Sequence, residues 1–335
     1  MSEIAVLGAG SWGIAISTVL DHNGHEVTLW EFDRREMERL SSQREHKLKL
    51  PGVIIPQGVK ITDQLDSAAS QADIITLALP SHTVREVAEQ IGKIELKNPI
   101  VVNLAKGIEN DTLLRMSEVL QQELPSSLHQ KITTLSGPSH AEEVARRIPT
   151  TVVVAGFREE VARKVQRAFM TPYFRVYTNS DILGVELGGS LKNIIAIASG
   201  ICDGMGLGDN SRGALISRGL AEIVRLGEKL GAKRETFGGL SGLGDLVTTC
   251  ISKFSRNRFV GEQIGRGRSL KDIQAQMPMV AEGIKTTISA YQLAIKHQVE
   301  MPITQQVYQV LFENKKPEEA MNELMTRDPK SEIWG

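Results

Sequence analysis

The sequence predicts an α/β protein: an N-terminal doubly wound, Rossmann-type sheet that is mostly parallel, followed by a mainly helical C-terminal domain. Short apolar runs that end near glycine or proline alternate with helical spacing through the first half of the chain, which is typical of βαβ units. After about residue 180 these runs disappear and long helical patterns replace them. Because 335 residues exceed the usual size of one domain, we expect two, over residues 1–180 and 181–335.

The expected strands are short apolar segments, and the expected helices have a period of 3.6 residues. The strands lie at residues 3–7, 26–30, 74–79, 100–104, 132–135 and 151–154, with helices at 14–20, 84–91 and 113–120 between some of them. Residues 49–56 contain two prolines and a glycine and predict an ordered loop. The helices expected in the second domain lie at residues 185–201, 214–230, 269–276, 284–297, 304–312 and 317–325.

The first strand runs directly into a glycine-rich turn that contains Gly8, Gly10 and Gly13. The first glycine allows a tight turn, the second lets a pyrophosphate approach the backbone, and the third lets helix and strand pack closely. The start of the following helix offers free N–H groups to phosphate. Strand, glycines, helix and second strand in this order predict a dinucleotide-binding domain. The alternative is a glycine turn that binds nothing.

Composition narrows the possible function classes. The formal net charge of −1 gives no overall attraction to nucleic acid or an anionic membrane, and two cysteines fit a reduced compartment. The longest apolar runs, such as residues 194–201, fall short of the ~20 residues that cross a bilayer. The first strand begins at residue 3, which leaves no room for a signal peptide. We expect a cytoplasmic protein without a nucleic-acid partner or stable membrane insertion.

Neither the histidines nor the arginines form a cluster that indicates metal or nucleic-acid binding. His22 and His25 form the one close histidine pair, and no third ligand stands near them in the sequence, so we expect no metal site. The arginines between residues 256 and 268 are accompanied only by Phe259, which is no stacking platform for nucleic-acid bases.

Candidate site residues follow three of the expected strands. Pro80 and Ser81, Lys106, and the segment 137–141 all stand at carboxyl ends, where an open α/β sheet binds its ligands. Lys106 lies beside a glycine and is placed to contact a cofactor or a substrate oxygen. The alternative is a surface lysine in a turn.

Lys192 is the most informative single residue of the second domain. Its helical neighbours three and four positions away are Gly188, Gly189, Ile195 and Ala196, so no carboxylate shares its helix face. A desolvated lysine without an anionic partner has a lowered pKa, which suits a proton donor and acceptor near neutral pH. The alternative is a lysine whose ammonium reaches solvent past small residues.

Two further segments of this domain carry polar side chains at expected helix starts. Asp245 ends a glycine-rich run; it is a candidate N-cap of a helix at 246–250 and a candidate site residue, and the two roles are compatible. Ser255 is the expected N-cap of the next helix, where Arg256 and Asn257 would make a phosphate site with the backbone N–H groups. The alternative for this second segment is a solvated basic turn.

Taken together, the motifs closely resemble the NAD(P)-dependent glycerol-3-phosphate dehydrogenases of the bacterial type. The resemblance extends over nearly the whole chain, and it rests on residues 8–13, 50–52, 105–107, 137–139, 191–193, 242–245, 255–257 and 280–283. It implies reversible hydride transfer between dihydroxyacetone phosphate and sn-glycerol 3-phosphate with NAD(H) or NADP(H). It further implies a role in glycerophospholipid synthesis and a homodimer.

The resemblance also implies residue roles, which add to the glycine turn and to Glu31 and Phe32 at the end of the second strand. Lys192 is the expected catalytic proton acceptor and donor at the C2 oxygen of the substrate. The expected substrate contacts are Lys106, Gly137, Ser139, Lys192, Asp245, Thr249, Ser255, Arg256 and Asn257. Together with the glycine turn, the expected cofactor contacts are Gly8, Gly10, Ser11, Trp12, Gly13, Glu31, Phe32, Lys106, Ala141, Arg256, Val280 and Glu282.

Glu31 departs from the pattern of the resembling family, which often has a small residue here followed by a basic or histidine side chain. An acidic side chain at the end of the second strand accepts hydrogen bonds from the adenosine ribose. Arg34 and Arg35 would favour a 2′-phosphate or pair with Glu31, so preference between NAD and NADP stays open.

Two other function classes share parts of this pattern. A β-hydroxyacid or ketopantoate-type reductase has the same two-domain plan and a helix-borne lysine, but it does not need a phosphate-binding segment such as 255–257. A non-catalytic redox sensor would bind the dinucleotide without needing a general acid. Turnover of a phosphorylated substrate separates both from the main interpretation.

Overall fold

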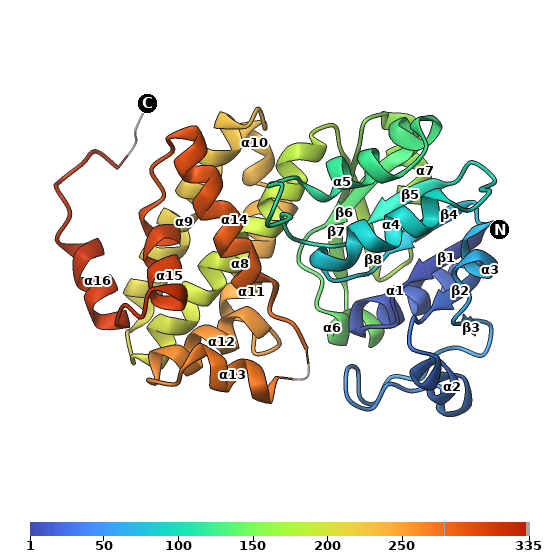
Figure 1. Cartoon of the computed structure of the whole chain (residues 1–335), viewed down its shortest axis with the longest axis horizontal. Helices are drawn as coiled ribbons and strands as arrows, with labels where there is room; N and C mark the ends of the chain where they lie inside the picture. The colour runs from blue at the N-terminus through green and yellow to red at the C-terminus, as the bar shows by residue number, and fades with distance from the viewer. Residues whose placement is uncertain (278, 333–335) are drawn as a thin grey trace.

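The computed structural model describes residues 1–277 and 279–332. Its N-terminal part is one sheet covered by helices on both faces, and its C-terminal part is helical (Figure 1). The sheet order is β3-β2-β1-β4-β5-β6-β7-β8. The strands are β1 (Glu3–Leu7), β2 (Glu26–Trp30), β3 (Lys60–Thr62), β4 (Ile74–Leu77), β5 (Ile100–Asn103), β6 (Ile132–Ser136), β7 (Thr150–Gly156) and β8 (Phe174–Asn179).

The expected fold class is confirmed, because all strand pairs are parallel except β6 with β7. Leu7 pairs with both Trp30 and Leu77, so β1, β2 and β4 end at the same edge. Their runs are apolar because both faces are buried. One face packs on α1 (Ser11–His22), α6 (Ala141–Ala145) and α7 (Glu159–Phe169), and the other on α3 (Leu65–Ala69), α4 (Val84–Gly92) and α5 (Met116–Glu123).

The loop at 49–56 is ordered as expected, since Arg44 Nε donates to the Ile55 carbonyl and the Gly52 N–H to Glu45. Other details differ from the sequence-based expectation. β3, β8, α7 and the polar helix α2 (Arg34–Gln43) were not expected. The helix expected at 113–120 begins only at Met116, because Leu113 has a positive φ of 62° that no helix continues.

The second domain is built around α8 (Ile182–Gly204), which follows two residues after β8. α12 (Arg256–Gly265) packs directly on α8 through glycines: a Cβ at Gly261 would lie 1.9 Å from the Ile197 carbonyl oxygen. The other helices here are α9 (Asp209–Lys229), α10 (Arg234–Phe237), α11 (Asp245–Ile251), α13 (Leu270–Gln276), α14 (Glu282–His297), α15 (Pro302–Phe312) and α16 (Pro317–Met325).

By length and composition alone, α8 is apolar enough to cross a membrane, which the shorter run at 194–201 did not suggest. However, 94% of its apolar window is buried inside the molecule. Its neighbours in the core are α9, α11, α12 and α14, and burial among them accounts for its apolar sequence. α8 is therefore the core helix of the second domain.

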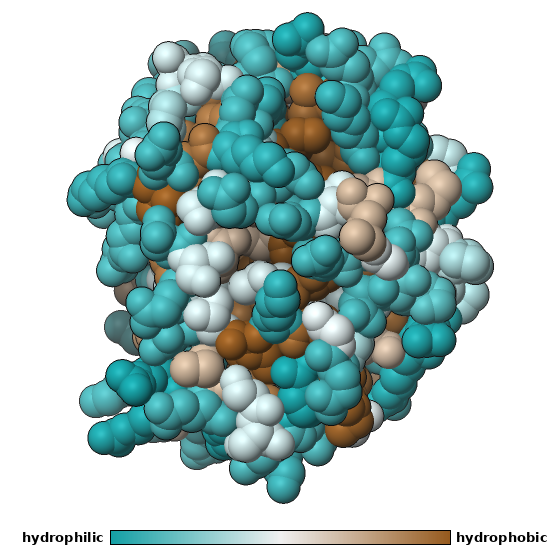
Figure 2. All heavy atoms as spheres, turned by 90° about the vertical axis from the view of Figure 1, so that its right-hand side faces the viewer, coloured by the Kyte–Doolittle hydropathy of each residue, from teal (hydrophilic) through white to brown (hydrophobic). Residues whose placement is uncertain are grey.

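The two domains meet at the carboxyl edge of the sheet, and a buried carboxylate ties them together. Glu186 of α8 accepts hydrogen bonds from the Arg115 guanidinium at 2.7 Å, the Ser117 hydroxyl at 2.6 Å and the Thr134 hydroxyl at 3.1 Å. Because α8 also carries Lys192, this contact fixes the helix against β6 and α5. The opposite end of the N-terminal domain is mostly hydrophilic, with small groups of apolar atoms between the polar side chains (Figure 2).

Candidate active site

The turn after β1 has the geometry that its three glycines predicted. Gly8 has a φ of +106°, and a Cβ there would lie 2.7 Å from the Ala78 carbonyl oxygen. A Cβ at Gly13 would lie 1.8 Å from the Gly8 carbonyl oxygen, so α1 packs against the turn without room for a side chain. A Cβ at Gly10 would meet no atom within 4 Å, which leaves open space beside this backbone.

The start of α1 faces this open space. Gly10 is its N-cap and makes no side-chain capping bond, and the first turn has no acidic residue. The N–H groups of the first turn lack helical partners by geometry, so they are available to an anion. A dinucleotide pyrophosphate therefore fits this turn, and Gly8, Gly10 and Gly13 would hold it.

The other expected cofactor residues surround the turn in different environments. The Ser11 hydroxyl donates to the Lys49 carbonyl at 2.6 Å and lies 3.5 Å from Met279 Sδ, so it links the 49–56 loop to the segment before α14. Trp12 packs against the core, with its ring 6.5 Å from that of Phe174. Ala141 is buried at the start of α6, whereas Phe32 and Val280 are exposed.

Glu31 is buried at the end of β2, with only 3% of its surface exposed. Its carboxylate accepts the Asp33 N–H at 3.2 Å, and burial raises the pKa of Glu31 above its usual value. Among the residues that it describes, the structure contains no ion pair between Glu31 and Arg34 or Arg35, so this alternative is not supported. Arg34 instead pairs with Glu38 at 3.2 Å, one turn along α2.

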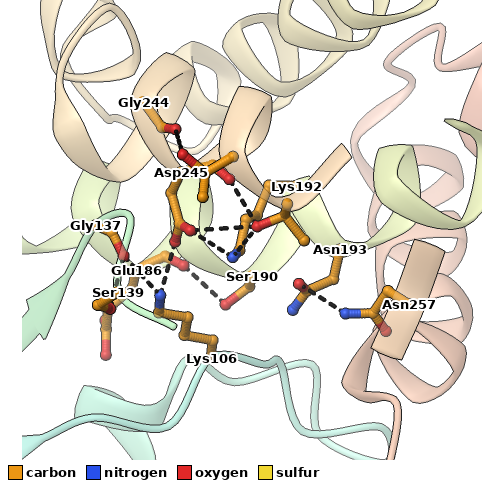
Figure 3. A network of polar contacts seen from close by, with 12 residues as sticks. Lys106, Gly137, Ser139, Glu186, Ser190, Lys192, Asn193, Gly244, Asp245 and Asn257 are labelled. Atoms are coloured by element: carbon orange, nitrogen blue, oxygen red, sulfur yellow. Dashed lines mark hydrogen bonds and ion pairs between the residues drawn. The ribbon is translucent and has the colours of Figure 1, made fainter. Parts of the chain in front are cut away.

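Lys192 and Asp245 form the centre of the site, where α8 and α11 meet (Figure 3). Lys192 Nζ lies 2.6 Å from Asp245 Oδ1 and donates to the Thr249 hydroxyl, also at 2.6 Å. The Thr249 hydroxyl in turn donates to the Asp245 backbone carbonyl at 2.7 Å. The three side chains are buried, so the ammonium is held in one place.

Lys106 approaches the same carboxylate from the N-terminal domain. Its Nζ lies 2.7 Å from Asp245 Oδ2 and 3.0 Å from the Gly137 carbonyl oxygen, which also accepts the Ser139 hydroxyl at 2.9 Å (Figure 3). Asp245 therefore lies between two lysines that come from different domains. These contacts join the two domains at the carboxyl ends of β5 and β6.

One expectation about Lys192 and one of the two roles considered for Asp245 are wrong at this point. Lys192 was expected to lack an anionic partner, but Asp245 supplies one from another helix, which the helix face of Lys192 alone does not reveal. Asp245 was also considered as an N-cap, but Gly244 occupies that position and the Asp245 side chain accepts from the two lysines.

Burial and pairing act on these groups in opposite directions. Burial lowers the pKa of Lys192 to about 8, although the Asp245 carboxylate raises it in part. Burial raises the pKa of the Asp245 carboxyl, but Lys106 and Lys192 outweigh this effect and hold that pKa below its usual value. The site thus combines an ionised carboxylate with a lysine able to gain or lose a proton near neutral pH.

The segment 255–257 starts α12 beside this pair. Ser255 is the N-cap, as expected, and its hydroxyl oxygen accepts the Arg258 N–H at 3.2 Å. Asn257 Nδ2 donates to Asn193 Oδ1 at 2.9 Å, which places the segment next to Lys192. Arg256 is an exposed residue, and in the part of the chain that the structure describes no hydrogen bond or ion pair engages its guanidinium; burial lowers the pKa of Arg256, and the charges of Glu282 and Glu142 oppose this effect. Arg256 is therefore free to bind an anion.

The carboxylate of Glu282, an expected cofactor contact, is engaged by hydrogen bonds in this structure. Its Oε1 accepts the Ser81 N–H at 3.1 Å, and its Oε2 accepts the Ser81 hydroxyl at 2.5 Å. The remaining expected substrate residues do come together. Hydrogen bonds join Lys106, Gly137, Ser139, Lys192, Asp245 and Thr249 in one network, and the bond from Asn257 to Asn193 places the start of α12, with Ser255 and Arg256, next to it.

Two residues of this region were given no role of their own from the sequence, although one of them, His140, lies in the candidate segment 137–141. His140 Nε2 is buried without a hydrogen-bond partner, and burial lowers the pKa of His140 to about 4, with Lys192 contributing. The Ser136 hydroxyl is likewise buried and unpartnered at the end of β6. In the sequence, only their position beside the Gly137 motif indicates that they belong to the site. Across residues 1–277 and 279–332, no group of three His, Cys, Asp or Glu side chains is placed to hold a metal ion.

A glycine turn that fits a dinucleotide pyrophosphate, together with a buried lysine of lowered pKa where the two domains meet, is the arrangement of a dinucleotide-dependent oxidoreductase. A profile described as the NAD-dependent glycerol-3-phosphate dehydrogenase N-terminus matches residues 3–162, and one described as the C-terminus matches residues 181–322. The chain belongs to the NAD-dependent glycerol-3-phosphate dehydrogenase family.

Individual relatives agree with this assignment over their full length. The chain is 52% identical to a glycerol-3-phosphate dehydrogenase (NAD(P)+) of Thermoanaerobacter sp. strain X514, covering 99% of each chain. It is 53% identical to one of Carboxydothermus hydrogenoformans, covering 99% of this chain and 98% of the relative. The crystal structure of glycerol-3-phosphate dehydrogenase from Coxiella burnetii superimposes with a TM-score of 0.93 at 38% identity, covering 97% of this chain and 99% of that one.

Proposed function

We propose that this chain is an NAD(P)-dependent glycerol-3-phosphate dehydrogenase that interconverts dihydroxyacetone phosphate and sn-glycerol 3-phosphate. The observation that carries the proposal is the buried pair of Lys192 and Asp245 beside the uncommitted guanidinium of Arg256. Lys192 donates or accepts a proton, and Arg256 binds an anion. A three-carbon ketone with a terminal phosphate needs both.

Lys192 is the proton donor in the direction of reduction. When bound, the nicotinamide cofactor would supply the hydride. Addition of a hydride to the C2 carbonyl carbon of the ketone develops negative charge on the C2 oxygen. An ammonium held 2.6 Å from Asp245 and 2.6 Å from Thr249 is already oriented, so it needs little reorganisation to stabilise that charge. In oxidation the neutral amine removes the C2 hydroxyl proton. A pKa near 8 allows both directions.

Asp245 and Lys106 keep this group in place. The two carboxylate oxygens of Asp245 each accept from one lysine, so rotation of the carboxylate would break both contacts. Lys106 is partly exposed toward the cleft, with 21% of its side chain accessible, and can turn toward a substrate oxygen. Its contacts also hold Gly137 and the following turn against the helical domain.

The phosphate of the substrate is bound at the start of α12. Arg256, the first residue of this helix, offers a guanidinium that can bind a phosphate through two hydrogen bonds, and the first turn of the helix offers backbone N–H groups. Asn257 is fixed by Asn193, the residue after Lys192, so the spacing between phosphate and C2 oxygen is set by packing of α12 on α8. Substrates without phosphate lose this contact.

A substrate comparison tests the proposal. NADH and NADPH oxidation is followed by absorbance with dihydroxyacetone phosphate, unphosphorylated dihydroxyacetone and ketopantoate. We expect turnover with the phosphorylated ketone and kcat/KM lower by a factor of 100 or more with the other two. Turnover of ketopantoate in preference would identify a β-hydroxyacid or ketopantoate-type reductase, and no turnover of any substrate would leave only a dinucleotide sensor.

We also propose the cellular setting that this activity implies. The product would supply the backbone of glycerophospholipids, in the cytoplasm, as a homodimer without nucleic-acid or membrane partners. Burial of α8 supports the last point, since among the described residues the one helix that is both long and apolar enough to cross a membrane is a core helix. Sedimentation analysis should give twice the monomer mass of 36.8 kDa, and cell fractionation should recover the protein with the soluble fraction.

A further inference from the structure

Ser81 is a second point where the domains meet, close to the site but apart from the lysine pair. It follows β4, is 6% exposed, and gives both its N–H and its hydroxyl to Glu282, the first residue of α14. The distances are 3.1 and 2.5 Å. One carboxylate thus binds two groups of a single residue across the domain boundary. We call this contact the Ser81–Glu282 clasp.

The clasp is packed against the turn that carries Lys106. A Cβ at Gly107 would lie 2.4 Å from the Ser81 hydroxyl oxygen and 3.5 Å from Glu282 Oε2. Gly107 therefore has to be glycine for the turn after β5 to lie on Ser81. This close packing puts Ser81, Gly107 and Lys106 in one rigid group at the sheet edge.

On the other side, the clasp leads to the phosphate-binding segment. Gly283, next to Glu282, donates its N–H to Asn257 Oδ1 at 2.9 Å, and Asn257 donates to Asn193 at 2.9 Å. A Cβ at Gly283 would lie 2.7 Å from the Asn193 carbonyl oxygen. The first turn of α14 is thus the common support of Asn257 and Asn193, the neighbours of Arg256 and Lys192.

The rest of α14 is held to the N-terminal domain independently of Ser81. The Ser289 hydroxyl donates to the Ile108 carbonyl at 3.1 Å, and Asn110 Nδ2 donates to the Lys285 carbonyl at 3.3 Å. Loss of the clasp should therefore release only the first turn and leave the domains docked. This makes a local test possible.

We propose that Ser81 is a positioning residue: by holding Glu282 it fixes the first turn of α14, so that the phosphate site at Arg256 and Asn257 is complete only while the clasp is closed. Ser81 is not expected to contact the C2 oxygen of the substrate or the Lys192 ammonium. It acts on substrate binding through Glu282, Gly283 and Asn257. The assay with dihydroxyacetone phosphate rests on the proposed function, whereas the exchange measurement below does not.

The test compares Ser81→Ala with Thr83→Ala. Thr83 lies in the same turn, and its hydroxyl donates only to the Pro80 carbonyl at 2.9 Å, so it is a matched hydroxyl deletion. We expect Ser81→Ala to raise the KM for dihydroxyacetone phosphate about tenfold with kcat changed less than threefold, because a hydrogen bond to a charged group is lost. Thr83→Ala should match the native protein.

Hydrogen exchange of the full chain provides a readout without turnover. In Ser81→Ala the amides at the start of α14, around Gly283, should exchange at least tenfold faster, while residues 286–297 keep their native rates. An unchanged exchange rate at Gly283, or an unchanged KM, would overturn the proposal. If the native protein has no activity on dihydroxyacetone phosphate, the proposed function fails, but the exchange result still decides the role of the clasp.

Discussion

Asp245 Oδ1 lies 2.6 Å from Lys192 Nζ, and the second oxygen of the same carboxylate lies 2.7 Å from Lys106 Nζ. One buried anion is therefore shared by a lysine from each domain. Its charge opposes the effect of burial on Lys192, and its geometry holds the ammonium in the cleft. The pH dependence of the reaction should report this balance.

The reaction should depend on pH through Lys192, whose pKa is about 8. Reduction needs the protonated form, so kcat/KM for dihydroxyacetone phosphate should be constant below pH 8 and fall as pH rises through it. Oxidation needs the neutral amine, so kcat/KM for sn-glycerol 3-phosphate should rise over the same range. Profiles between pH 7 and 10 measure both. Two profiles that bend in the same direction would contradict this assignment.

Asp245→Asn should move that bend to lower pH. Without the carboxylate, burial and the charge of Lys106 both lower the pKa of Lys192, and only the smaller effect of Cys250 opposes them. We expect the bend in the reduction profile to shift by about one unit or more, equivalent to ~1.4 kcal/mol, with lower activity at pH 7.5. A bend that stays near pH 8 would show that Asp245 acts only as a structural contact.

Arg256→Ala should chiefly raise the KM for dihydroxyacetone phosphate, with a smaller loss of kcat. A hydrogen bond to a charged group contributes ~1.5–3 kcal/mol, so an increase of roughly 10- to 100-fold is expected. Arg266→Ala is the control, because Arg266 pairs with Glu262 on the outer surface of the same helix and is well exposed. If both variants have native KM values, the phosphate binds elsewhere.

Glu31→Ala should shift cofactor preference toward NADPH. The carboxylate at the end of β2 would accept hydrogen bonds from the adenosine ribose and repel a 2′-phosphate, while Arg34 is occupied by Glu38. We expect a modest native preference for NADH and a tenfold change in the ratio of kcat/KM values, or ~1.4 kcal/mol. Glu26→Ala is the matched control, because Glu26 begins β2 at the end opposite to Glu31 and pairs with Lys60 at 3.8 Å. A native enzyme that strongly prefers NADPH would exclude this role for Glu31.

The sequence predicted the parts of the fold that follow from local rules. The strand, glycine turn and helix over residues 3–20 were predictable because each glycine meets a specific steric demand, and Gly8 and Gly13 meet theirs in the structure. β3 and β8 were missed because one has three residues and the other alternates buried and exposed positions at the sheet edge. Edge strands do not show the continuous apolar pattern of central ones.

The site was predictable residue by residue but not as pairs. Lys192 and Asp245 were each identified, yet their contact joins helices that are far apart in sequence, and helical spacing carries no information about it. The same holds for Ser81 and Glu282, which are 201 positions apart. Long-range contacts of this kind depend on how α8, α11 and α14 pack, and no local pattern records that.

The most direct test of the account is the rate of NADH oxidation with dihydroxyacetone phosphate by Lys192→Ala. The variant should fold and bind NADH as the native protein does, because the glycine turn and Lys192 belong to different domains. A general acid contributes a factor of ~10²–10⁴, and loss of the ammonium beside the C2 oxygen adds to this. We predict a kcat at least 100-fold below native; a value within a few-fold of native, with NADH binding intact, would remove Lys192 from the mechanism.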